Sequence, residues 1–259
     1  MLSTLSKCGL QAQYRYVDGI KSPPGVALVL GTAVHKSAHA DLSSKLETGA
    51  LLPEKQIQEL AGEALEKTWD EDEPHLDDDE KDLGLERVKG KTKDDAIDLA
   101  VLHHRKLAPT LNPIAVERKM RLVLDGNSFD LEGTIDVEEA DTVRDLKTAS
   151  KAPSADAAVG MPQLDMYVMM RDTIEKKKTR RVALDYLVKT TVPKVVSVPA
   201  PAPTSFGPIL RRIEMAARVF ETGAFYPVDP SGPSAWVCSP KWCGYWSTCP
   251  FGAARKVQG

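Results

Sequence analysis

The 259-residue sequence has no long apolar run and no excess of charge of one sign. No stretch approaches the roughly 18 consecutive apolar residues of a membrane-spanning helix, so no membrane partner is expected. The 34 basic and 37 acidic residues give a net charge of −3, which excludes a protein that binds nucleic acid through bulk positive charge. The first residues also lack the basic-then-apolar pattern of a secretory signal, and we therefore expect a cytoplasmic protein.

Cysteine is scarce too, with four residues in the chain. In an intracellular protein, so few thiols indicate metal binding rather than disulfides. The sequence contains no G-x-x-x-x-G-K-[ST] loop, so we expect no helicase motor, and any unwinding of a duplex must come from a partner. Contents of 42% hydrophobic and 27% charged residues are nevertheless ordinary for a folded globular chain.

Helical patterns occupy the N-terminal part of the chain. They predict helices at 3–18, 32–46, 53–69 and 93–106. The segment 70–82 carries nine carboxylates but has no EF-hand spacing and no central glycine. A solvated loop is therefore favoured there over a cation site.

Short strand patterns follow Pro113. Strands are predicted at 114–123, 128–138 and 142–147, joined by turns at Asp125-Gly126-Asn127 and at Glu139–Thr142. Such a run of strands and turns is typical of an antiparallel three-strand meander.

The remainder of the chain mixes helix and strand. The patterns predict a helix at 160–177, a strand at 182–190, a proline-rich connection at 193–208 and a helix at 209–222. Composition alone leaves open whether 193–208 is an ordered clamp or a floppy connection. The predicted fold class is α/β (α+β): a mixed β-sheet with a three-strand meander flanked by helices, with N-terminal helices and a C-terminal cysteine-rich segment.

Three charged side chains of the meander suit metal-dependent hydrolysis. Asp145 and Lys147 lie two apart on one strand and point to the same face, and the neighbouring strand can bring Asp136 beside them. Two close carboxylates repel each other unless a cation lies between them, and their oxygens suit Mg²⁺ or Mn²⁺. The lysine could position a water or neutralise charge on a phosphate. Taken alone, however, a D-x-K pair is more often a solvated ion pair.

Five short motifs, in this order, resemble the PD-(D/E)xK nuclease superfamily, in the branch of the RecB nuclease domain and the CRISPR-associated RecB-like exonucleases. They are Cys8 followed by QYRYVDG, GTAVHK with His35, GTIDVEE with Asp136, DLKTAS with Asp145 and Lys147, and PQLDMY with Gln163 and Tyr167. The resemblance runs from Cys8 to Cys249. It implies a restriction-endonuclease-like core in a single nuclease domain over 1–259, with a helical part at 1–111, a catalytic core at 112–190 and a cluster segment at 191–259.

The resemblance also implies the roles of the central residues. His35, Asp136, Asp145 and the carbonyl of Leu146 would hold Mg²⁺ or Mn²⁺, and Lys147 would orient the attacking water and stabilise the transition state. Outside the G-x-x-x-H context, a lone histidine would be interpreted as structural. Asp145 stands where many members have glutamate, a variant that the family accepts.

Three further residues are candidates for this site. Gln163 and Tyr167 lie four apart on one predicted helix face and would contact the DNA strand or the lysine. Without the motif, the same pair would be interpreted as the edge of a core. Glu117, in VERK, is a candidate extra acid, although the wet face of a strand explains it equally well.

The cysteine pattern predicts a metal centre. Cys238, Cys243 and Cys249 fall within twelve positions, and Cys8 is the remaining thiol. Four thiolates suit a [4Fe–4S] cluster or Zn²⁺. The arrangement resembles the iron–sulfur staple of AddB-type and CRISPR-associated RecB-like nucleases, which favours iron–sulfur. One departure is the four-residue gap SPKW, where the family often has two residues.

Local basic groups could line a path for DNA in spite of the acidic total. The candidates are Lys177, Lys178, Arg180 and Arg211, although a lysine run also suits the C-terminus of a helix. The aromatic side chains among the cysteines could stack on unpaired bases, but packing around a cluster is favoured.

The function predicted is that of a metal-dependent DNA exonuclease, hydrolysing phosphodiester bonds at DNA ends in recombination or repair. DNA, single- or double-stranded, is the expected partner, together with a helicase or recombination protein. The alternative is a catalytically weak DNA-binding partner that keeps the fold and the cluster. The intact set of His35, Asp136, Asp145 and Lys147 argues against this alternative.

Overall fold

The computed structural model describes the chain as two compact units. One contains Met1–Leu28, Glu71–Val88 and Gly207–Gly259, holds all four cysteines and is called the cysteine unit below. The other contains Val29–Asp70 and Lys89–Phe206, holds the β-sheet and is called the sheet unit. The residues described are 1–123, 129–229, 231–232 and 234–252. A single domain over 1–259, with parts at 1–111, 112–190 and 191–259, stays a prediction.

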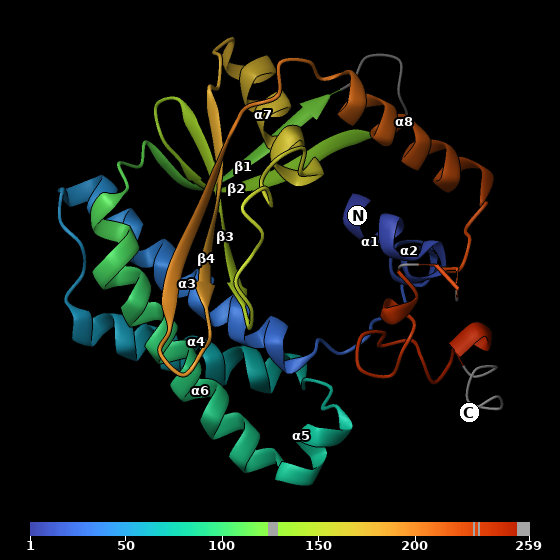
Figure 1. The fold of residues 1–259 in the computed structure, drawn as a ribbon, viewed down its shortest axis with the longest axis horizontal. Coiled ribbons are helices and arrows are strands. Elements are labelled where there is room, and N and C mark those ends of the chain that lie inside the picture. Colours follow the sequence, from blue (N-terminus) through green and yellow to red (C-terminus); the bar gives the residue numbers. More distant parts are fainter. Residues whose placement is uncertain (124–128, 230, 233, 253–259) are drawn as a thin grey trace. The chain divides into compact units, whose positions relative to one another are not determined.

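The sheet unit is built on a five-stranded sheet with the order β1-β2-β3-β4-β5 (Figure 1). The strands are β1 (Ala115–Val123), β2 (Asp130–Glu138), β3 (Thr142–Ala149), β4 (Arg181–Val188) and β5 (Lys194–Pro201). The first three form an antiparallel meander, β3 and β4 are parallel, and β5 is antiparallel to β4. The parallel step needs a crossover, which contains α7 (Pro162–Glu175). The predicted mixed sheet with its meander is confirmed.

Helices cover both faces of this sheet. α7 lies against β1, β2 and β3 and buries Leu164, Val168 and Met170. On the other side lie α3 (Val26–Thr48), α4 (Glu54–Asp72) and α6 (Leu85–Leu102) (Figure 1). The α3 backbone comes close to β3, because a methyl group on Gly31 would lie 3.2 Å from Thr148 Oγ1. This layering is the α/β architecture that the order of elements predicts.

Part of the proline-rich segment 193–208 is a strand, which the sequence patterns do not predict. β5 pairs with β4 along its whole length, ending at Pro201. Pro199 and Pro201 have no N–H to donate to a ladder, and they are tolerated because β5 is an edge strand. This half of the segment is therefore an ordered part of the sheet.

The first predicted helix, at 3–18, is in fact two helices. α1 (Leu2–Lys7) and α2 (Gly9–Tyr16) meet at Cys8, whose backbone is extended, with φ −159° and ψ 121°. A methyl group on Gly9 would lie 2.6 Å from the backbone N and O of Tyr226. The helix is therefore interrupted where two distant segments of the cysteine unit approach closely, which a local helical pattern cannot reveal.

The acidic segment 70–82 is not the continuous loop that its charge predicts. α4 extends to Asp72, and α5 (Asp78–Leu83) follows in the cysteine unit. The side chain of Asp77 accepts a hydrogen bond from the Glu80 N–H, and the side chain of Glu80 accepts one from the Asp77 N–H. This reciprocal cap, with acidic residues in the first turn, stabilises the start of a helix.

Other helix boundaries differ from their predictions by several residues. α3 begins before the predicted start at residue 32, and α6 begins before residue 93 and continues into a π-helix, His103–Leu107, and a 3-10 turn, Ala108–Thr110. The cysteine unit ends with α8 (Gly207–Thr222) and a 3-10 turn at Ala235–Val237. The predicted turn at Asp125-Gly126-Asn127 lies outside the described residues. No helix in the described part of the chain has the length and apolar character needed to cross a membrane.

Candidate active site and cysteine cavity

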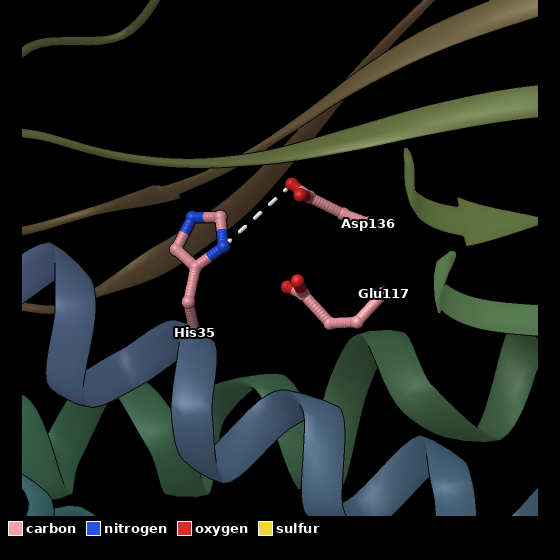
Figure 2. Close-up of side chains that lie close together, drawn as sticks. All are labelled: His35, Glu117 and Asp136. Atoms are coloured by element: carbon pink, nitrogen blue, oxygen red, sulfur yellow. Dashed lines mark ion pairs between the residues drawn. The ribbon is translucent and has the colours of Figure 1, made fainter. Parts of the chain in front are cut away.

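Three side chains from three elements meet on the side of the sheet that faces α3. His35 of α3, Glu117 of β1 and Asp136 of β2 each offer a ligand atom, and these atoms lie within 4.8 Å of one another (Figure 2). The His35 Nδ1 atom lies 3.6 Å from Asp136 Oδ2. One imidazole and two carboxylates are a ligand set suited to a divalent cation. Glu117, a candidate extra acid in the sequence, is thus placed beside the two principal candidates.

The backbone of Glu117 is unusual for a strand residue. Its φ angle is +48°, in the left-handed region that residues with a Cβ atom rarely adopt. The β1–β2 ladder pairs Val116 with Val137 and Arg118 with Ile135, and omits the intervening pair of Glu117 and Asp136. Strained backbone of this kind costs on the order of 1–3 kcal/mol and is frequent at functional sites. Here the strained backbone lies at the residue whose carboxylate completes the group of three with His35 and Asp136.

Asp136 lies where β2 and β3 diverge. These strands pair only at Val137↔Arg144 and Glu138↔Val143, and beyond them Asp136 Oδ2 accepts a hydrogen bond of 2.8 Å from the Leu146 N–H. Burial raises the pKa of Asp136, and the neighbouring His35 opposes that shift. The structure thus uses the amide of Leu146 to hold Asp136, while metal ligation by the Leu146 carbonyl stays a prediction.

Asp145 lies outside the group of three and is ion-paired with Lys147. The Lys147 Nζ atom lies 2.7 Å from Asp145 Oδ2, but the contact does not have hydrogen-bond geometry, so this buried oxygen accepts no hydrogen bond from a described residue. Burial raises the pKa of Asp145 to about 6, Asp136 adds to the shift, and Lys147 opposes it. The Lys147 ammonium group is the charge partner of this oxygen, and the carboxylate keeps further lone pairs that could bind a cation.

A chain of hydrogen bonds continues from Lys147 to α7. The ammonium group donates to Gln163 Oε1 at 3.2 Å, and Gln163 Nε2 donates to Tyr167 Oη at 2.9 Å. Tyr167 packs over Gly133, where a methyl group would lie 2.9 Å from Tyr167 Cε1. Burial raises the pKa of Tyr167 to about 12, so its hydroxyl stays protonated near neutral pH. In the structure Gln163 therefore contacts Lys147 and Tyr167, and a contact of Gln163 with DNA stays a prediction.

The sequence matches a family model over residues 1–250, that of the PD-(D/E)XK nuclease superfamily. The chain belongs to this superfamily.

One solved structure shares the fold of this chain. This structure, from Eubacterium rectale and described as a candidate exonuclease, has a TM-score of 0.55 and 11% identity, over 90% of this chain and 85% of that chain. At this identity the likeness concerns the fold alone. Another, SSO0001, has a TM-score of 0.35 and 16% identity over 96% of each chain, too low a score to carry an argument. No curated protein matches the sequence significantly.

A buried ion pair that sequence reasoning missed fixes α7 of the nuclease to the meander. Arg171 and Glu138 are both fully buried, and Arg171 Nε donates to Glu138 Oε1 at 2.6 Å. The same guanidinium donates to the carbonyls of Glu139 and Ala140 in the turn after β2. The partners lie 33 positions apart, so no local spacing reveals the pair. It holds the helix that carries Gln163 against the strand that carries Asp136.

A second missed group lies behind the three ligand side chains. A pocket lined in part by His35, Glu117 and Asp136 also contains His103 and Arg144. Burial lowers the pKa of His103 to about 3, which keeps this ring neutral. Arg144 is bound to Asp185 through Nη1 at 2.9 Å. The sequence offers one signal for Arg144. It precedes Asp145 on a strand, so its side chain is expected on the opposite face of the sheet from that of Asp145.

The four basic residues predicted to contact DNA, Lys177, Lys178, Arg180 and Arg211, are exposed. Lys177, Lys178 and Arg180 lie between α7 and β4 in the sheet unit, and Lys177 is ion-paired with Glu175 at 3.4 Å. Arg211 is exposed on α8, in the cysteine unit. Their role in DNA binding stays a prediction.

All four cysteines of the nuclease line one cavity in the cysteine unit. Cys8 enters from the break between α1 and α2, and Cys238, Cys243 and Cys249 come from the C-terminal segment. None of the four cysteines forms a disulfide. No three of the four Sγ atoms, all in the described part of the chain, lie within 4.8 Å of one another. Bonds of about 2.3 Å to one tetrahedral Zn²⁺ would place the sulfurs about 3.8 Å apart. The spacing is therefore wider than a single zinc ion requires.

Proposed function

We propose that this nuclease is a metal-dependent DNA exonuclease that hydrolyses phosphodiester bonds at DNA ends. The observation that carries the proposal is the cluster of His35, Glu117 and Asp136 near the Asp145–Lys147 ion pair, on a PD-(D/E)XK fold. A DNA-binding protein without catalysis would have no need to keep two carboxylates buried at the cost of raised pKa values.

The residues of the site fit Mg²⁺ or Mn²⁺. Asp136 and Asp145 both have raised pKa values because of burial, so a cation would relieve the cost of ionising them. His35, Glu117, Asp136 and Asp145, with the Leu146 carbonyl, would hold the ion. When bound, the ion would polarise the phosphate and lower the pKa of a water.

Lys147 would act on the attacking water and on the phosphate. Its ammonium group is held between Asp145 and Gln163, which fixes its position, and Tyr167 in turn fixes Gln163. From there it would orient the water and neutralise the charge that develops on the phosphate oxygens. Gln163 and Tyr167 would thus serve the reaction through the lysine.

We further propose that the four cysteines hold a [4Fe–4S] cluster. The cavity brings together all four thiols, and their sulfur atoms are spaced more widely than one zinc ion requires. This spacing supports the cluster over Zn²⁺. Thiolate ligation would fasten the first helices of the cysteine unit to its C-terminal segment, a covalent staple that lowers the entropy of the unfolded chain.

The biological setting proposed is DNA recombination or repair in the cytoplasm. Because the sequence has no helicase motor, we propose that a helicase or recombination protein supplies the unwound DNA.

A time course on end-labelled DNA tests the exonuclease proposal. Anaerobically purified protein is incubated with linear single-stranded DNA, linear duplex and closed circles, with Mg²⁺, Mn²⁺ or EDTA. Stepwise loss of linear DNA with a divalent ion, and intact circles, is the expected result. Cutting of closed circles would indicate an endonuclease. Binding of DNA without cleavage in every metal would favour the non-catalytic DNA-binding protein.

A further inference from the structure

The indole of Trp246 holds a buried hydrogen-bond donor with no acceptor. Its Nε1 atom is shielded from solvent and has no hydrogen-bond partner among the described residues. Trp246 lines the same cavity as the four cysteines. Buried donors in native proteins are almost always satisfied, so an orphaned N–H at a cavity indicates an acceptor that belongs in that cavity.

The backbone donors of the cysteines are already occupied. Each cysteine N–H donates to a backbone carbonyl: Cys8 to Thr4 at 3.0 Å, Cys238 to Ala235 at 3.0 Å, Cys243 to Ser239 at 2.9 Å and Cys249 to Tyr245 at 2.8 Å. The hydroxyl of Tyr245, another lining residue, donates to the Ile20 carbonyl at 2.9 Å. The backbone N–H groups of the four cysteines and the hydroxyl of Tyr245 are thus engaged elsewhere.

The cavity also lacks a positive charge. Among the lining residues that the structure describes there is no lysine, arginine or histidine. Four thiolates and a metal–sulfur centre carry net negative charge, which is costly in an apolar cavity unless neutral donors face the sulfurs. Tyr14, whose side chain carries a neutral hydroxyl donor, also lines the cavity.

We propose that Trp246 Nε1–H donates a hydrogen bond to a sulfur of the iron–sulfur cluster and thereby raises the reduction potential of the cluster. This inference rests on the cofactor proposed above. The donor stabilises negative charge on sulfur, and the reduced cluster carries one more electron than the oxidised one, so the hydrogen bond favours reduction. Trp246 is thus a residue that tunes the cluster and is not one of its ligands.

The substitution Trp246→Phe tests the proposal, because it removes the N–H and keeps an aromatic ring. Trp236→Phe is the matched control: it makes the same change in the same segment, at a side chain that is 56% exposed and does not line the cavity. Anaerobic redox titrations followed by EPR should give a more negative midpoint potential for Trp246→Phe than for wild type and Trp236→Phe. Equal potentials in all three proteins would overturn the proposal.

A measurement on the wild type covers the case in which Trp246→Phe does not retain a cluster. Protein with ¹⁵N-indole tryptophan is exchanged into D₂O, reduced and measured by ENDOR. Coupling of the cluster's electron spin to an exchangeable deuteron and to indole ¹⁵N supports the hydrogen bond, provided that the same couplings are seen in Trp236→Phe. Absence of both couplings overturns the proposal. A wild type without visible absorption or iron would instead refute the cofactor, and the inference with it. The two failures are therefore distinguishable.

Discussion

Asp145 combines near-complete burial with a carboxylate oxygen that accepts no hydrogen bond from a described residue. Burial is the main cause of its raised pKa of about 6, against an ordinary value of 3.8. In metal-free protein, the folded chain therefore keeps a proton on Asp145 at pH values where the unfolded chain has released it. A bound cation would reverse this preference, because it stabilises the ionised form.

This difference predicts how stability depends on pH. Since folded Asp145 keeps a proton between pH 3.8 and about 6 that the unfolded chain releases, this residue should lower the free energy of unfolding in EDTA across the window by about 2 to 3 kcal/mol. Asp145→Asn should lack this part of the fall. Urea unfolding at a series of pH values measures it. Asp95→Asn is the control, since Asp95 is also paired with a lysine, Lys189, at 3.0 Å. Equal pH slopes in wild type and Asp145→Asn would contradict the assignment.

Glu117 makes a second prediction at the scale of one residue. Glu117→Gln keeps the size of the side chain but removes a negative ligand, so the Mg²⁺ concentration for half-maximal cleavage should rise by roughly 10-fold or more. Saturating Mg²⁺ should restore much of the rate. Glu132→Gln, at a side chain that is 71% exposed on β2, should leave the Mg²⁺ titration unchanged. Identical titrations for Glu117→Gln and wild type would remove Glu117 from the site.

At the scale of elements, α7 joins the site to the core. Its first two turns carry Gln163 and Tyr167, and its third carries Arg171, which is bound to Glu138 at the end of β2. The ion pair thereby sets the register of α7 against the strand that bears Asp136.

Removing one partner of this pair should destabilise the fold. Arg171→Met takes from the buried Glu138 carboxylate one of its two arginine partners, and Arg118 Nη1 still donates to Glu138 Oε2 at 3.0 Å. The loss should therefore lie above that of a surface pair and reach at most the roughly 3–5 kcal/mol of a buried charge left unpaired. The double variant Arg171→Met with Glu138→Leu should recover part of the loss, because no charge is then left buried. Urea unfolding measures both. Arg121→Met, which breaks an exposed pair with Asp130, should cost no more than about 1 kcal/mol. If Arg171→Met lowered the free energy of unfolding by no more than Arg121→Met does, the buried ion pair would not have the stabilising role assigned to it.

The elements that could be predicted are those whose signals are local. Alternating apolar residues and turns locate β1 to β4, and apolar periodicity locates α7. β5 was not predicted because its prolines are typical of a connecting segment. They are tolerated in this strand because it lies at the edge of the sheet, and that position is a property of the whole sheet. The break at Cys8 was also missed, and it lies beside the close approach of Gly9 to Tyr226, a contact between distant segments that no local pattern reveals.

The same division holds for the site. Motifs select His35, Asp136, Asp145 and Lys147, and the structure brings these residues to the same region of the sheet unit. The position of Glu117 depends on a left-handed backbone angle that no composition or spacing encodes.

At the scale of the whole molecule, the chain separates its two predicted metal centres. The sheet unit holds the carboxylates and the histidine, and the cysteine unit holds the four thiols. The cysteine unit is assembled from three separate stretches of sequence, which is where a cluster bound by Cys8 and the C-terminal thiols would stabilise most.

The proposed place of DNA hydrolysis is the cluster of His35, Glu117 and Asp136, assisted by Lys147. The most direct test is single-turnover cleavage of end-labelled DNA by wild type, Lys147→Ala and Lys189→Ala. Both lysines are ion-paired with aspartates in the sheet unit, but only Lys147 is bonded to Gln163. The account predicts a loss of at least about 100-fold for Lys147→Ala, with an unchanged fold by circular dichroism, and a wild-type rate for Lys189→Ala. Full cleavage by Lys147→Ala would contradict it.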